Sequence, residues 1–463
     1  MHIRAKVLTI VTLATAILLP NVAYAEVPDP TVEGPITAGL HGRPWFSSLI
    51  DLNSFGYVEE EFFFSGDAEG SPYKTRMVVR RPADPDDFSG TVYVEWVNVT
   101  GGRDLETLWP AGHPTILREG HAYVVVSAQL VGHTELRAWD PVRYGTLEHP
   151  GDTPGSFRIF EQALQAIRSP AEVAPLGNLE AEYVIATGDS QSAGRLTTYI
   201  TERYAIEGLI DGFLPGRGGG NEDTGAVAAE LEVPMLWILE EDQAERPDDT
   251  AWQKFWFQAG AAHAPLDWNH YVWRSDMRDL GQNAPVPDAI NAGCSVNRGE
   301  GYAVRSGIHW INRWVRGLDR PGQGNGPKDF VPPTSPRIER DEAGDPVRDE
   351  IGHVIGGIRY PYIEAPVGVN SAEICPLFGN YEPFPSGDLV TRYPTKQDYV
   401  AAVREAADRS VEEGFLLRED RKQLLTEAHT FDVWSPGAAA CHDLRSPVER
   451  IYYESPLQPC PPG

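Results

Sequence analysis

The sequence predicts an α/β fold built on a doubly wound, mostly parallel sheet, with a C-terminal cap or extension. Runs of β-branched and aromatic residues alternate with segments whose apolar residues recur every three or four positions. One run, residues 122–127, is almost entirely apolar, as expected for a strand covered on both faces. Another, residues 183–187, leads directly into a helical pattern, which is typical of parallel βαβ units.

Eight strands are expected between about residues 55 and 260. They are residues 57–65, 75–81, 91–97, 122–127, 183–187, 208–214, 234–239 and 255–257. Residues 155–169 have the spacing of a crossover helix, and a second helix begins immediately after the strand at 183–187. Residues 397–413 are a further helix candidate in the C-terminal part.

The chain divides into three parts by composition. Residues 1–25 have a basic start, a short apolar run and a small-residue cleavage pattern, so a signal peptide cut after Ala25 and an exported protein are expected. Residues 26–320 contain the strands and form the expected catalytic core. A segment rich in Pro and Gly then opens residues 321–463, a linker followed by a cap or extension packed on the core.

The charge balance limits the partners. The chain has 39 Lys and Arg against 67 Asp and Glu, so its net charge of −28 argues against nucleic acid and anionic membranes. In an oxidising compartment the even number of cysteines allows two disulfides in any of three pairings. The four are Cys294, Cys375, Cys441 and Cys460.

A serine lies where the strand at 183–187 turns into a helix. Gly188-Asp189-Ser190-Gln191-Ser192 is close to the Gly-x-Ser-x-Gly pattern, in which small residues let strand and helix approach closely around a nucleophile. Ser192 replaces the second glycine with another small residue. Ser190 is therefore the expected nucleophile, and it needs a histidine, an acid and oxyanion donors around it. A helix cap is the structural alternative.

With this motif the chain resembles the α/β-hydrolase superfamily, in particular an exported bacterial group whose elbow reads G-x-S-Q-S-[AG]. The similarity extends from about residue 43 to the C-terminus and includes residues 94–102 and 292–317. The resemblance implies a secreted hydrolase of carboxylic esters or related acyl compounds. From the chemistry of the residues we expect an acyl-enzyme on Ser190 and no cofactor.

In that superfamily the acid and the histidine follow the nucleophile at the ends of later strands. His263, in a small-residue loop after the last strand, is the expected base. Acidic residues follow the strand at 234–239, and Glu241 is preferred there, with Asp242 second and Glu240 third. Asp211 is an outside candidate.

By analogy with the fold, the oxyanion donors are backbone N–H groups of Gln191 and of the loop after the third strand, around Asn98 and Val99. Glycines at 101 and 102 allow that loop a close approach. A simple turn is the alternative.

Other interpretations remain. The Gly-Asp-Ser opening is also similar to lipase-like hydrolases that use an Asp-x-x-His pair, which Asp267 and His270 match in spacing, although that family places its serine after the first strand. A secreted binding module on the same fold and an acyltransferase with the same nucleophile are further alternatives. Histidine spacing supports no metal site. Four tryptophans lie near His263 in the sequence and could either pack in the core or stack on sugar rings: Trp252, Trp256, Trp268 and Trp273.

Overall fold

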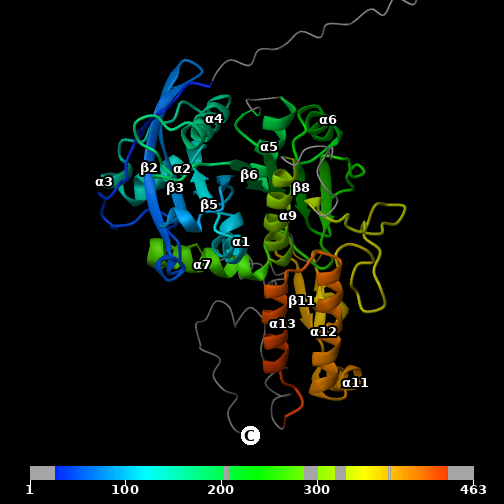
Figure 1. The fold of residues 1–463 in the computed structure, drawn as a ribbon. Coiled ribbons are helices and arrows are strands. Elements are labelled where there is room, and N and C mark those ends of the chain that lie inside the picture. Colours follow the sequence, from blue (N-terminus) through cyan, green and yellow to red (C-terminus); the bar gives the residue numbers. More distant parts are fainter. Residues whose placement is uncertain are drawn as a thin grey trace, which may run out of the picture.

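A nine-stranded, mostly parallel sheet forms the centre of the protein (Figure 1). The computed structural model describes residues 27–202, 206, 208–285, 301–318, 330–373, 375 and 377–435. The strands lie side by side in the order β1-β2-β3-β5-β4-β6-β7-β8-β9. Their bounds are Thr31–Glu33, Tyr57–Ala68, Ser71–Pro82, Thr91–Trp96, Ala122–Val126, Tyr183–Asp189, Gly212–Gly216, Met235–Leu239 and Gln253–Phe257 for β1 to β9.

The first strands are antiparallel and the rest are parallel. β2 and β3 form a long hairpin paired from Tyr57 to Ala68, and β3 pairs antiparallel with β5. From β5 through β9 every neighbouring pair is parallel, so the carboxyl ends of β6, β8 and β9 lie at the same edge. The expected α/β fold with a mostly parallel sheet is confirmed.

All eight expected strands exist, with two differences. The short edge strand β1 was not expected, since three residues are too few for a periodic signal. The strand expected at 208–214 begins only at Gly212. Leu209 and Ile210 are apolar because they are buried in the core, although they lie in a turn before the strand.

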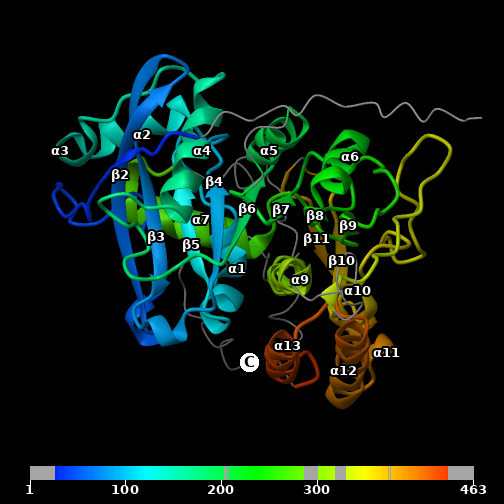
Figure 2. The same cartoon turned by 45° about the horizontal axis from the view of Figure 1, so that its top comes forward.

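Helices cover both faces of the sheet. They are α1 (Leu108–Arg118), α2 (Leu130–Trp139), α3 (Pro141–Tyr144), α4 (Gly155–Arg168), α5 (Gln191–Thr201), α6 (Glu222–Leu231), α7 (Leu266–Leu280) and α9 (Tyr302–Leu318). Apolar residues of α4, α5 and α6 pack on one face, and those of α1, α7 and α9 pack on the other. Figure 2 shows α5 and α6 on one side of β6 to β8 and α9 on the opposite side.

Strand β4 contributes side chains to the hydrophobic clusters on both faces of the sheet. Val92 and Trp96 belong to the cluster under α4, whereas Tyr93 belongs to the cluster under α1 and α9. Side chains alternate between faces along a strand, so a strand with helices on both sides is mostly apolar; the buried Glu95 of β4 is an exception, bound by the Thr107 N–H.

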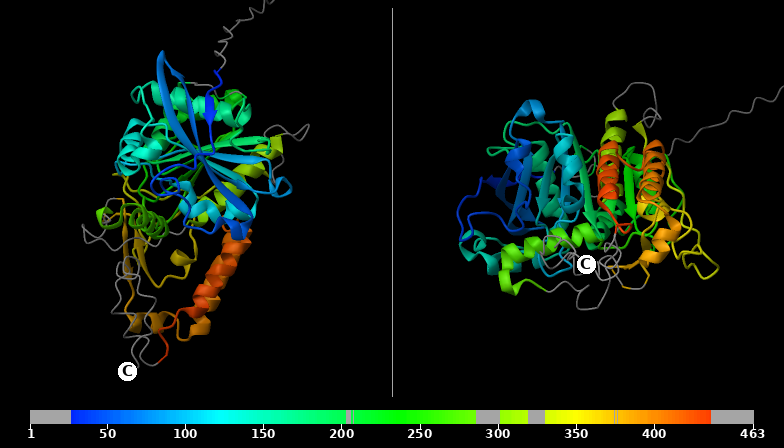
Figure 3. Two further views of the ribbon diagram at one scale, coloured as in Figure 1. Left: turned by 90° about the vertical axis from the view of Figure 1, so that its left-hand side faces the viewer. Right: turned by 90° about the horizontal axis from the view of Figure 1, so that it is seen from below.

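The described residues of the C-terminal part add a small hairpin and four helices. They are β10 (Gly368–Ser371), β11 (Asn380–Pro383), α10 (Pro361–Glu364), α11 (Ser386–Arg392), α12 (Lys396–Glu412) and α13 (Arg418–Thr430). The helix expected at 397–413 is confirmed as α12, which begins at a capping box between Thr395 and Asp398. Helices α12 and α13 lie side by side and extend away from the sheet (Figure 3).

Core residues hold this part against the sheet. Trp256 of β9 packs edge-on against Phe415, and its indole N–H donates to the Pro333 carbonyl at 2.7 Å. Arg305 of α9 forms an ion pair with Asp420 of α13 at 2.8 Å. These contacts join the C-terminal segment to the same hydrophobic cluster that lies under α1 and α9.

Two sequence predictions concern residues outside the described ranges. The expected signal peptide, residues 1–25, and three of the four cysteines lie there, so cleavage and disulfide pairing stay predictions. Within the ranges that the structure does describe, none of the helices combines the length and apolarity that crossing a bilayer requires.

Candidate active site

Ser190 lies in a sharp turn between β6 and α5. Its backbone has φ 58° and ψ −116°, a conformation that a non-glycine residue adopts at a cost, and its N–H donates to the Gly216 carbonyl at 3.0 Å. A side chain on Gly188 would meet Leu196 and Ser192 atoms at 3.1 Å, so the tight approach of strand and helix requires glycine there. The geometry is that of a nucleophile elbow.

Ser192 explains how the motif works without its second glycine. Its hydroxyl accepts from the Asp189 N–H at 2.8 Å and donates to the Asp189 carbonyl at 2.9 Å. The hydroxyl therefore binds both backbone groups of the residue that precedes Ser190, and it stabilises the turn from inside the helix.

His263 and a buried acid lie at the same sheet edge. His263 follows β9, Glu240 follows β8, and Oε1 of Glu240 lies 2.5 Å from Nδ1 of His263. Burial lowers the pKa of His263, but the hydrogen bond and charge of Glu240, with a smaller contribution from Asp189, outweigh it and leave the pKa raised. Because Nδ1 is bound to Glu240, Nε2 is the ring nitrogen available for proton transfer.

The preferred acid, Glu241, does not occupy this position, which corrects the sequence-based choice. The Glu241 carboxylate points away and accepts hydrogen bonds from Arg348 and from the N–H groups of Gly260 and Ala372. Glu240, ranked third from the sequence, makes the contact because consecutive side chains leave the strand end in different directions.

The remaining acid candidates lie elsewhere. Asp242 is exposed to solvent on the turn. Asp211 precedes β7 at the amino end of that strand, where it pairs with Arg168 and accepts from the Val184 N–H at 2.7 Å. That end is opposite to the edge that carries Ser190.

One of the expected oxyanion donors is engaged elsewhere. Gln191 is the first residue of α5, and its N–H has no acceptor within the helix, as an oxyanion donor requires. The N–H of Asn98, in contrast, donates to the Leu105 carbonyl at 3.2 Å. Asn98 acts through its side chain, which donates to the Asp189 carbonyl at 2.9 Å, so Val99 is the candidate second donor.

Ion pairs and hydrogen bonds fix the loop that follows β4. Arg76 of β3 binds Asp104 at 2.9 Å, and Arg80 binds Glu106, with all four side chains buried. The Thr107 N–H donates to Glu95 at 2.6 Å. Anchors on two strands hold the loop in one conformation, which favours donors that are already oriented.

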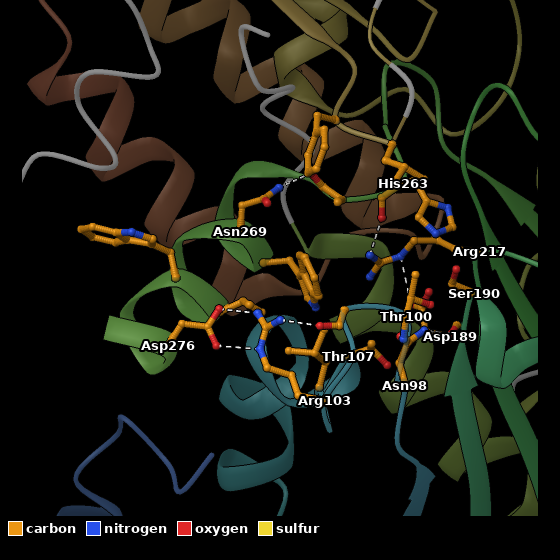
Figure 4. Close-up of a pocket in the computed structure, with 18 of the residues that line it drawn as sticks. Asn98, Thr100, Arg103, Thr107, Asp189, Ser190, Arg217, His263, Asn269 and Asp276 are labelled. Carbon is orange, nitrogen blue, oxygen red and sulfur yellow. Dashed lines mark hydrogen bonds and ion pairs between the residues drawn. The ribbon is translucent and has the colours of Figure 1, made fainter. Parts of the chain in front are cut away.

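Arg217 is a site residue that the sequence analysis missed. It follows β7, its Nε lies 3.0 Å from Asp189, and its Nη1 donates to the His263 carbonyl at 2.5 Å. It thereby joins the residue before Ser190 to the backbone of the histidine, as Figure 4 shows. The signal was visible: Arg217 is the one side chain in the run Gly216 to Gly220, where glycines allow close approach to the elbow.

Ser190, His263 and Arg217 line one side of a cavity of about 440 Å³. Arg103 and Asp276 lie on the opposite side, joined by two hydrogen bonds of 3.0 and 2.5 Å (Figure 4). The lining is otherwise mainly apolar: Leu105, Ala264, Trp268, Val272, Trp273, Pro285, Leu377 and Phe378.

The cavity also decides between earlier alternatives. Trp268 and Trp273 line it, whereas Trp252 and Trp256 are core residues. Among the described residues of the lining the histidine is His263, while Asp267 and His270 both lie on α7. The geometry therefore favours His263 over the Asp-x-x-His arrangement.

Fold and site together define the α/β-hydrolase class. A profile described as "Alpha/beta hydrolase domain" matches residues 32–426, and the chain belongs to this family. The match spans the C-terminal segment as far as α13 as well as the sheet. A search of curated proteins finds no match.

Solved structures similar to the chain include hydrolases at low identity. Esterase Est22 with p-nitrophenol is 16% identical over 40% of this chain and 64% of its own, with a TM-score of 0.28. A structure from an analysis of two fungal esterases from Rhizomucor miehei is 15% identical over 42% of this chain and 73% of its own, with a TM-score of 0.25. A prolyl endopeptidase is 12% identical over 50% of this chain and 34% of its own, with a TM-score of 0.28.

Proposed function

We propose that this protein is an exported serine hydrolase that cleaves neutral carboxylic esters through an acyl-enzyme on Ser190. The observation that carries the proposal is the arrangement at one cavity. A serine in a strained strand-to-helix turn and a histidine bonded to a buried carboxylate line the same space. A mere helix cap would require neither the histidine nor the buried acid.

Each group has a chemical role in this proposal. The Ser190 hydroxyl attacks the ester carbonyl while Nε2 of His263 takes its proton, and Glu240 stabilises the imidazolium that forms. The N–H groups of Gln191 and Val99 hold the oxyanion. His263 then protonates the leaving alcohol, and water, activated by the same ring, releases the acid from Ser190.

The cavity supports an uncharged substrate. Among the described lining residues, both arginines have a carboxylate partner, Arg103 with Asp276 and Arg217 with Asp189, so these charges are balanced. An additional carboxylate would lose its water without gaining a free cation, whereas an apolar group would contact Leu105, Trp268 and Val272. We therefore propose esters with an apolar acyl or alcohol group.

Export rests on the residues of the first 25 positions. N-terminal sequencing of the protein from a secreting bacterial host tests it. A mature chain that begins at Glu26 supports the proposal, and an intact Met1 in the cytoplasmic fraction contradicts it.

A fluorophosphonate probe tests the nucleophile. The wild-type protein should become labelled and lose ester hydrolysis together, and Ser190→Ala should abolish both. Thr198→Ala, at a partly exposed position of the same helix, is the matched control and should keep both. Labelling that survives in Ser190→Ala would remove Ser190 from the mechanism, and an unlabelled, inactive wild type would favour a binding module.

A further inference from the structure

Glu241, the residue after the proposed acid, joins several segments at one buried point. Its side chain is fully buried, and its carboxylate accepts hydrogen bonds from the Gly260 N–H at 2.8 Å and the Ala372 N–H at 2.8 Å. Nη2 of Arg348 lies 2.9 Å from the same carboxylate. A buried charge with this set of partners is stable only while the partners stay in place.

Two of the joined segments carry the proposed catalytic pair. Glu241 follows Glu240 directly, and Gly260 begins the loop that leads to His263. The Glu241 N–H also donates to the Ala261 carbonyl at 3.3 Å. Glu241 thus connects the turn after β8 to the loop after β9, and these are the turns whose relative position sets the contact between Glu240 and His263.

The third segment is a tandem repeat in the C-terminal part. Arg340-Asp341-Glu342-Ala343-Gly344 is followed eight residues later by Arg348-Asp349-Glu350-Ile351-Gly352. The two copies fold alike. In each, the aspartate accepts backbone N–H groups, at 2.8 and 3.0 Å from Asp341 and at 3.0 Å from Asp349, and each arginine donates to the carbonyl of its own glycine at 3.0 Å.

Both repeat arginines reach the turn of the acid. Nη2 of Arg340 donates to the Glu241 carbonyl at 3.1 Å and to the Gln243 carbonyl at 2.6 Å, while Nη2 of Arg348 binds the Glu241 carboxylate. The first arginine therefore fixes the backbone of the turn, and the second fixes its buried side chain. The turns of the repeat do not themselves require these contacts, because a hairpin on the surface can form without arginines that point into the protein.

We propose that Glu241, Arg340 and Arg348 are positioning residues that hold Glu240 against His263, so that the C-terminal repeat completes the catalytic site. This inference rests on the proposed hydrolase function. None of the three touches the substrate; they act through Glu240 and His263. The C-terminal segment is then a working part of the site rather than a detachable extension.

Arg348→Met tests the proposal, with Arg348→Lys as the conservative variant. Arg409→Met is the control, because Arg409 lies in the same C-terminal part but binds Glu364 and Glu405, away from the repeat. With p-nitrophenyl acetate, Arg348→Met should lower kcat about 10²-fold with KM little changed, since small displacements of catalytic groups have costs of this size. Arg348→Lys should recover part of the loss, and Arg409→Met should behave as wild type.

Two readouts separate positioning from simple stability. In Arg348→Met the acid limb of the pH profile should move to lower pH, and the downfield proton resonance of the His263 imidazole N–H should weaken or shift upfield. A variant whose Tm falls while limb and resonance stay unchanged would show a purely structural role and overturn the proposal. The resonance can be measured without turnover. If the wild type is inactive, the proposed function is contradicted, and the resonance alone still shows whether Arg348 holds Glu240 against His263.

Discussion

Oε1 of Glu240 lies 2.5 Å from Nδ1 of His263, and the Glu240 side chain is almost completely buried. A carboxylate in this position fixes the tautomer of the ring and stabilises its protonated form. The neighbouring Glu241 is equally buried but binds Arg348 and two backbone N–H groups. The two consecutive glutamates therefore differ in their contacts: Glu240 binds the imidazole ring, and Glu241 binds the backbone and Arg348.

Glu240→Gln should lower kcat for ester hydrolysis by about 10⁴-fold, because an amide in place of the carboxylate favours the wrong tautomer of the ring. Asp242→Asn, an exposed acid two residues away, should leave kcat within a few-fold of wild type. Steady-state kinetics with p-nitrophenyl acetate measures both. A stronger loss in Asp242→Asn than in Glu240→Gln would show that the acid has been assigned wrongly.

The pH profile should show the raised pKa of His263. Only the neutral ring can accept the proton of Ser190, so kcat/KM should fall as the pH drops through a midpoint above the usual histidine value of about 6.5. Burial lowers this pKa, but Glu240 and Asp189 raise it by more, while Arg217 lowers it slightly. Glu240→Gln should move the limb to lower pH; a limb that stays in place would remove Glu240 as the cause.

The sequence predicted the sheet better than the site. The strands depend on a local pattern, namely continuous apolar runs, and all eight expected strands exist. The strand-to-helix turn at Ser190 depends on the small residues around it, and its role as a nucleophile elbow stays a prediction. The choice between Glu240 and Glu241 depends on the direction in which each side chain leaves the end of β8, and contacts with residues 348 and 372 set that direction. Asn98 was misread for a similar reason, since pairing with Leu105 uses its N–H.

Arg217 and the C-terminal repeat escaped because their partners are far away in the sequence. The glycines around Arg217 indicate a close approach, but they do not identify Asp189 and the His263 carbonyl as its partners. The eight-residue repeat was detectable as a pattern, but its contact with the turn after β8 follows only from the packing of the C-terminal segment.

The pair of Asp189 and Arg217 gives a prediction about stability. Their side chains are 11% and 9% exposed, so Arg217→Met leaves a buried carboxylate without its cation and should lower the free energy of unfolding by about 3 to 5 kcal/mol. Adding Asp189→Asn removes the charge and should recover part of that loss. Urea denaturation measures all three variants. A double variant less stable than Arg217→Met would contradict the idea of an uncompensated charge.

The balanced charges of the cavity predict substrate preference. The p-nitrophenyl ester of 3-phenylpropanoic acid should exceed its para-carboxylate derivative in kcat/KM by at least about tenfold, a difference of about 1.4 kcal/mol. The two substrates share the leaving group, and the neutral para-carboxamide derivative, which is close in size to the carboxylate, isolates the charge. A preference for the carboxylate derivative would instead make Arg103 or Arg217 a substrate-binding cation and would contradict the proposed neutral ester.

Val272→Trp tests whether the phenyl group of the phenylpropanoate ester occupies the cavity between Leu105 and α7. Val272 lines the cavity from α7, and the larger ring should fill space that the phenyl group needs. The variant should lose kcat/KM for the phenylpropanoate ester but keep most of its activity on p-nitrophenyl acetate, whose acyl group is a single methyl carbon beyond the carbonyl. Equal losses on both esters would mean that the ring disturbs Ser190 or His263 rather than the binding of the acyl group. Unchanged activity on both would place the acyl group elsewhere, because a filled cavity cannot accept a phenyl ring.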